Sequence, residues 1–151
     1  MPLETEADYE QLAAHLREID PIVEPFSQAH GYRLMRWPLG GRYPNRMMDR
    51  QCGRVTQSIQ ITMDLHPDGE RFDRFFPDSP YTVFGAAWMD DSATRTRWSA
   101  PTIRNENIPF TVLLRVIPIY LSHFDTYLSS LNEDSIRAFQ ATSKLGDPGW
   151  V

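Results

Sequence analysis

An alternation of apolar and polar residues over 11 positions, broken only at Gln57, constrains the fold more than any other feature of the chain. Apart from Gln57, the side chains that point to one side of residues 55–65 are apolar: Val55, Ile59, Ile61, Met63 and Leu65. Because successive side chains of a strand point to opposite faces, this period of two predicts a half-buried β-strand. Its apolar face must be covered by a second layer of structure.

The N-terminal part of the chain has a helical pattern. Tyr9, Leu12, Leu16 and Ile19 recur at helical spacing and predict one apolar helix face. Pro21 cannot continue the hydrogen-bond ladder, so we expect a kink there and a second helical piece over residues 21–30, capped by Asp20. Gly31 occupies the position of a left-handed C-terminal cap.

A second helix is expected near the C-terminus, over roughly residues 110–131. Its apolar stripe is broad: Leu113, Leu114, Ile117, Leu121, Phe124, Leu128 and Leu131. Pro118 lies inside this stripe and predicts a kink or a break.

Short strands separate the two helical regions. Residues 32–37, 55–65, 81–89 and 94–100 are strand-like, whereas the glycine- and arginine-rich residues 39–53 are interpreted as a loop or a ragged hairpin. Short connections favour antiparallel pairing. We therefore predict an α+β fold: the kinked N-terminal helix, a four- to five-stranded antiparallel sheet, and the C-terminal helix packed on one sheet face. The length predicts one domain over residues 1–140, with 141–151 as a loosely held tail.

Residues 81–100 are expected to form a hairpin around Asp90 to Ala93. If the turn has two residues, Asp91-Ser92, the apolar face of the hairpin would meet the core; a three-residue turn would change this assignment. The other face of the hairpin would carry Phe84, Trp88, Arg95 and Arg97, and large aromatics beside arginine are typical of interface hot spots. In this register Trp88 is opposite Arg95, and the two can stack as a cation–π pair.

An arginine-rich stretch follows the first helix. Residues 31–60 carry a net charge of +5, and aromatic residues, Tyr43 among them, are interleaved. The stretch could bind single-stranded nucleic acid or an acidic protein, with Arg42, Tyr43 and Arg46 as contacts. Alternatively, its arginines pair with the acidic residues 1–24, which carry a net charge of −6.

The polar row Thr56, Ser58, Gln60, Thr62 and Asp64 has two interpretations as well. It is either a solvated sheet face or, with Phe84, Trp88, Arg95 and Arg97, part of an open docking surface.

Three local patterns resemble chemical sites, and each has a simpler explanation. The alternating Asp64, His66, Asp68 and Glu70 could bind a divalent ion, but turn chemistry explains them, so we expect no metal. Cys52 lacks a surrounding nucleophile motif. Ser122, His123 and Asp125 point in different directions on a helix and cannot form a triad. No motif for a nucleotide, a cofactor or a catalytic serine is present, which disfavours an enzyme and predicts no cofactor.

Composition and charge exclude several classes of binding partner and of bound metal. The net charge of −5 disfavours a duplex-DNA binder, and a single cysteine excludes an internal disulfide and a cysteine-based zinc site. The acidic first residues differ from a signal peptide, and no stretch approaches the ~18 apolar residues of a membrane span, so we expect a cytoplasmic protein without membrane association.

These observations favour a non-catalytic domain that caps or neutralises a cognate protein partner. Immunity proteins that neutralise bacterial toxins and small acidic secretion chaperones share this size, charge and architecture, so the comparison is an analogy. The expected contacts are Phe84, Trp88, Arg95, Arg97, Arg42, Tyr43 and Arg46. The alternative is a small-molecule binder or an enzyme with a pocket between sheet and helices, for which Asp64, His66, Tyr81 and Arg97 supply polar groups. An unprotected sheet edge would also allow a homodimer.

Overall fold

The computed structural model describes residues 6–37, 45–63, 80–140 and 142–144. Within these residues the protein is α+β, with seven strands in one open antiparallel sheet and three helices. The elements in chain order are α1 (Glu6–His30), β1 (Arg33–Trp37), β2 (Asn45–Cys52), β3 (Val55–Met63), β4 (Tyr81–Asp91), β5 (Thr96–Ser99), β6 (Ile103–Ile108), α2 (Phe110–Ser129), α3 (Glu133–Ala138) and β7 (Thr142–Lys144). None of these helices is long and apolar enough to cross a membrane.

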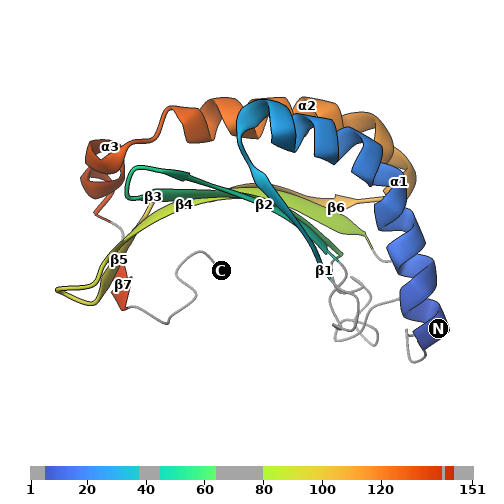
Figure 1. Ribbon diagram of the computed structural model, residues 1–151, viewed down its shortest axis with the longest axis horizontal. Coiled ribbons are helices and arrows are strands. Elements are labelled where there is room, and N and C mark those ends of the chain that lie inside the picture. The colour runs from blue at the N-terminus through green and yellow to red at the C-terminus, as the bar shows by residue number, and fades with distance from the viewer. Residues whose placement is uncertain (1–5, 38–44, 64–79, 141, 145–151) are drawn as a thin grey trace.

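The sheet is an arch, and the helices lie on its convex side (Figure 1). Its strand order is β1-β2-β3-β4-β5-β7, and β6 pairs with β4 beside this path. The helices α1 and α2 run along the arch, and α3 lies at the end of the sheet where β4 and β5 pair. In the described part of the chain, no helix covers the concave side.

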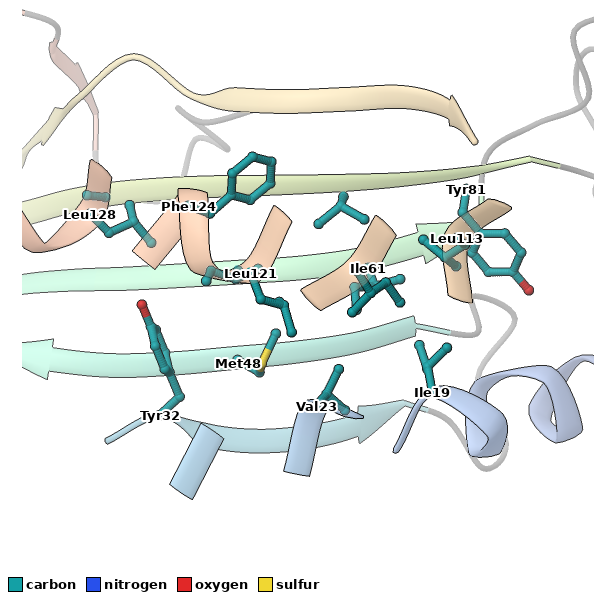
Figure 2. Close-up of a cluster of buried hydrophobic side chains, with 14 of the residues drawn as sticks. Ile19, Val23, Tyr32, Met48, Ile61, Tyr81, Leu113, Leu121, Phe124 and Leu128 are labelled. Carbon is teal, nitrogen blue, oxygen red and sulfur yellow. The ribbon is translucent and has the colours of Figure 1, made fainter. Parts of the chain in front are cut away.

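The core fills the layer between the sheet and the two long helices (Figure 2). Its largest fully buried side chains include Leu16, Ile19, Ile59, Ile61, Leu113, Ile117, Leu121 and Phe124. The predicted apolar row is confirmed from Val55 to Met63, and Leu65 lies outside the described residues. The predicted stripe of α2 is likewise buried at five of its positions, Leu113, Ile117, Leu121, Phe124 and Leu128.

The three prolines inside the helices do not divide them. The helix α1 is continuous through Pro21 and Pro25, and α2 is continuous through Pro118. Residues 21–30 are helical, as predicted, but they continue α1 instead of starting a new piece after Asp20. Of the two alternatives at Pro118, a kink or a break, the break is wrong. All three prolines lie on exposed helix faces, where water can satisfy the carbonyl groups that lose a donor.

The sheet has more strands than predicted, because residues 45–52, expected as part of a loop or a ragged hairpin, form the regular strand β2. β2 pairs with β1 on one side and β3 on the other, so it is an interior strand. Local sequence does not reveal it, because the residues that face the helices include two arginines, Arg46 and Arg50, whose partners are distant in the chain. The short strands β6 and β7 complete the sheet.

The C-terminal end of α1 is closed by Gly31, as predicted. Gly31 has φ +76°, and the Tyr32 amide donates to the Ser27 carbonyl at 2.9 Å. This bond and this conformation define a Schellman cap. The accompanying hydrophobic contact is made by the rings of Phe26 and Tyr32, whose centroids are 5.8 Å apart.

Gly31→Ala should lower the free energy of unfolding by about 1 kcal/mol, because a residue with a Cβ is strained at positive φ. A Cβ at this position would meet no atom within 4 Å, so the loss reports backbone conformation alone. Gly31→Asn is the matched control and should lose less, since asparagine tolerates this conformation. Urea denaturation measures both, and equal losses would contradict this explanation.

Candidate functional site

The concave face of the sheet consists of the side chains that point away from α1 and α2. The strand register places on it Arg33, Met35, Met47, Asp49, Thr56, Ser58, Gln60, Thr62, Thr82, Phe84, Ala86, Trp88, Arg97, Ser99 and Arg104. Phe84, Trp88 and Arg97 are half-buried, so each is partly accessible from this side. The predicted face of the β4–β5 hairpin is therefore present, apart from Arg95.

The hairpin turn is longer than predicted, which changes the pairing without exchanging the faces. Asp91 is opposite Thr96, so four residues form the turn instead of two. The Asp91 carboxylate accepts hydrogen bonds from the amides of Ala93 at 3.0 Å and Thr94 at 3.3 Å. Arg95 lies in the turn with φ 55°, so the predicted pairing of Trp88 with Arg95 is wrong, and Trp88 is opposite Ser99.

Arg97 stacks on Trp88 in place of Arg95. Its Cζ lies 5.3 Å from the centre of the Trp88 ring. Its Nε and Nη2 donate to the two carboxylate oxygens of Asp90 at 2.7 and 3.1 Å. The fork-shaped ion pair holds the guanidinium plane in place over the indole. Trp88, Arg97 and Asp90, which we call the tryptophan–arginine stack, thus combine an aromatic ring with a paired guanidinium group on the concave face.

Polar groups line the middle of the concave face. Gln60 Nε2 donates to the Ser58 hydroxyl at 3.4 Å, and this hydroxyl hydrogen-bonds to Asp49. Ser58 is fully buried and Gln60 is 5% exposed, so this part of the polar row is not a solvated surface. Oδ1 of Asp49 is buried and has no hydrogen-bond partner among the described residues. Burial raises the pKa of Asp49, against the opposing effects of Ser58 and Arg33.

A second polar cluster lies on the convex side, where both long helices end. Arg50 Nε donates to Gln57 Oε1 at 2.6 Å, and Nη1 donates to the His30 carbonyl at 2.9 Å. Nη1 also lies 2.9 Å from Asp125 Oδ1, and Nη2 donates to the Ser129 hydroxyl at 2.9 Å. We call these five residues the Arg50 cluster.

The carboxylate of Asp125 is enclosed by donors. The Tyr32 hydroxyl donates to Oδ1 at 2.8 Å, and His30 Nδ1 lies 3.2 Å from Oδ2. Burial and the bond to Asp125 raise the pKa of Tyr32 above its ordinary range. The charges of Arg50 and Asp125 compensate each other inside the cluster, which indicates that the Arg50 cluster has a structural role. Sequence spacing excluded Ser122 and His123 as partners of Asp125, and the histidine that pairs with it comes from another helix.

Of the remaining predicted contact residues, Arg46 is described by the structure, and it does not lie on the concave face. Arg46 is 5% exposed and points toward α1, where its Nε lies 2.7 Å from Asp20 Oδ1. This contact is the internal pairing with the acidic helix that was considered for the arginine-rich stretch. Arg42 and Tyr43 lie outside the described residues, as do Asp64, His66, Asp68 and Glu70.

The described residues contain no cluster of metal-ligating side chains. No group of three or more histidine, cysteine, aspartate or glutamate side chains could hold a metal ion in residues 6–37, 45–63, 80–140 and 142–144. Cys52 is a free and exposed thiol at the β2–β3 hairpin.

Comparison with known proteins gives no match: no family model, no curated protein and no solved structure is significantly similar to the chain.

Arg50→Met should destabilise the protein by about 3 kcal/mol, because it leaves Asp125 and Gln57 without their main partner in a shielded site. Arg104→Met is the matched control. Its ion pair with Glu106 is exposed, so its loss should change the free energy of unfolding by less than about 0.5 kcal/mol. Chemical denaturation measures both, and a small loss at Arg50 would show that the cluster is dispensable.

Asp49 and Asp91 should affect the pH dependence of stability with opposite sign. The raised pKa of Asp49 means that ionisation is costlier in the folded chain, so Asp49→Asn should be more stable than wild type at about pH 7 and lose this advantage at about pH 3. Hydrogen bonds from the Thr94 backbone lower the pKa of Asp91. Asp91→Asn should therefore be less stable at about pH 7, and this deficit should shrink as the pH falls. Denaturation at both pH values checks the two signs.

Proposed function

We propose that the protein is a non-catalytic binding domain that caps or neutralises a cognate protein partner, as immunity proteins and secretion chaperones do. The partner docks on the concave face of the sheet. The observation that carries this proposal is the tryptophan–arginine stack, which places an aromatic ring and a guanidinium group together on a sheet face that no helix of the described chain covers.

The chemistry of the stack suits a protein partner. Tryptophan and arginine are among the residues that most often dominate the energy of protein interfaces. Because Asp90 already holds Arg97 in place, binding would require little further ordering of these side chains. Half-buried polar side chains such as Thr62 lie on the same face and can take part in directed hydrogen bonds.

The arrangement of the basic residues favours a protein partner over nucleic acid. Arg46 pairs with Asp20 and Arg50 with Asp125, so both are directed toward the helices. Binding to a polynucleotide needs several accessible cations along one path. Arg46 and Arg50 therefore do not contribute to such a path in the described part of the arginine-rich stretch.

One observation favours the alternative, a small-molecule site between sheet and helices. The middle of that layer is filled by core side chains. At one end, however, the Tyr81 hydroxyl and His15 Nδ1 are buried and have no hydrogen-bond partner among the described residues. The ring centroids of Tyr81 and His15 lie 6.0 and 4.2 Å from that of Phe110. A polar ligand that satisfied these two groups would support this second candidate, and native mass spectrometry of the purified protein tests for one.

Trp88→Ala and Arg97→Ala should each weaken partner binding by about 2 kcal/mol, or roughly 30-fold in Kd, because each removes half of the stack. Wild type and variants serve as bait in a lysate of the native cells, and mass spectrometry identifies proteins retained by wild type and lost from both variants. Calorimetry with the purified partner then measures Kd.

Ile119→Ser is the matched control for this experiment. Ile119 is a large apolar residue on the convex side that is 66% exposed, so its replacement should leave both the fold and partner binding unchanged. Thermal unfolding confirms that all variants are folded. A partner that binds Trp88→Ala and Arg97→Ala as tightly as wild type would show that docking does not use the concave face.

A further inference from the structure

Arg95, the last residue of the β4–β5 turn, adopts a backbone conformation that is unfavourable for arginine. Its φ of 55° lies in the left-handed region, where the Cβ atom of an L-residue comes too close to the following carbonyl oxygen. Glycine has no Cβ and adopts this conformation without strain, and asparagine tolerates it. The turn would therefore be more stable with either of these residues. Strained positions of this kind are concentrated at functional sites.

The surrounding turn holds Arg95 in this conformation. Asp91 is opposite Thr96 at the base of the turn, and the Asp91 carboxylate accepts hydrogen bonds from the amides of Ala93 and Thr94 at 3.0 and 3.3 Å. The hairpin extends beyond the rest of the sheet at one end of the arch (Figure 1). Arg95 thus has a defined place at the tip of the hairpin that carries the tryptophan–arginine stack.

The side chain of Arg95 makes no contact within the described residues that offsets this strain. Arg95 is exposed, and no ion pair, hydrogen bond or ring contact joins it to another residue that the structure describes. The two neighbouring carboxylates have other partners, since Asp90 is bound by Arg97 and Asp91 accepts the amides of the turn. The positive charge of Arg95 is therefore available to a group outside the described chain.

We propose that Arg95 binds a carboxylate of the protein partner that docks on the concave face. This inference rests on the proposed function and names the chemistry of one partner group. A guanidinium group can form two parallel hydrogen bonds with a carboxylate, which makes such a contact both strong and directional. In Arg97, Nε and Nη2 already make this contact with Asp90, so the partner carboxylate binds at Arg95.

The strain is tested on the protein alone. Arg95→Gly and Arg95→Asn should each raise the midpoint of urea denaturation by roughly 0.3 M, because both residues adopt positive φ more readily than arginine. Ala93→Gly is the matched control in the same turn. Ala93 does not have positive φ, so the added freedom of the unfolded chain should lower the midpoint. Midpoints of both Arg95 variants at or below that of wild type would overturn the proposal.

The contact is tested with the protein that wild type retains from the lysate and Trp88→Ala loses, once it is identified and purified. Calorimetry should show that Arg95→Gly weakens binding at least about tenfold, and that Arg95→Lys, which keeps the charge but loses the paired hydrogen bonds, weakens it less. Arg17→Gln is the matched control, because it removes an exposed positive charge from α1 on the convex side. It should change Kd by less than about twofold.

Variants of the purified partner identify the carboxylate. Each aspartate or glutamate of its docking surface is replaced by the corresponding amide. One replacement should weaken binding to wild type about tenfold and binding to Arg95→Gly by less than about twofold, because the two groups interact only with each other.

The failures of the two proposals are distinguishable. If Trp88→Ala weakens binding and Arg95→Gly does not, the contact at Arg95 is wrong and docking on the concave face stands. If Arg95→Gly weakens binding but no amide variant of the partner is coupled to it, the carboxylate is wrong. If no protein is retained by wild type and lost from Trp88→Ala, docking on the concave face fails, and the contact at Arg95 fails with it.

Discussion

The hydrogen bonds of Arg50 connect the sheet to the ends of both long helices, and the arrangement of the layers depends on them. From the interior strand β2, the guanidinium reaches the last residue of α1 through the His30 carbonyl and the last residue of α2 through the Ser129 hydroxyl. Its positive charge also lies where the dipoles of both helices are negative. Gln57 completes the connection from β3, since its Nε2 donates to the Leu128 carbonyl at 2.6 Å. This contact explains why one polar residue interrupts an otherwise apolar row.

With both helices held on the convex side, the two faces of the sheet differ in chemistry. The convex side contains the aliphatic core, and its charged groups are paired across elements, as in Arg46 with Asp20. The concave side keeps side chains that pair within the sheet, such as Arg97 with Asp90 and Ser58 with Asp49. Bonds within the sheet stabilise the face itself and require no covering helix. Docking on this face, as proposed, would therefore need little further ordering of its side chains.

Hydrophobic periodicity predicted the elements that bury one apolar face. It failed for the strand whose buried face contains arginines paired with carboxylates far away in the sequence. The alternation of Val55–Met63 and the stripe of α2 identify strand and helix because one face of each is apolar. The strand β2 escaped prediction because Arg46 and Arg50 appear solvent-exposed in sequence and are paired with Asp20 and Asp125 in the fold. The register of the β4–β5 hairpin was wrong because Asp91 caps a four-residue turn in which Arg95 adopts positive φ. The faces were still correct, since the register changed by an even number of residues.

The positions of the arginines in residues 31–60 show why the net charge of this stretch does not predict a binding surface. Strand alternation sends Arg46 and Arg50 to the convex side, where the acidic residues of α1 and α2 neutralise them, and sends Arg33 to the concave side beside Asp49. A positive sequence segment is thus divided between an internal framework and a mixed surface. For the proposed docking, the relevant cations would be the few that remain partly accessible on a sheet face. Arg97 is such a cation, because it is held between a carboxylate and an indole on the concave face.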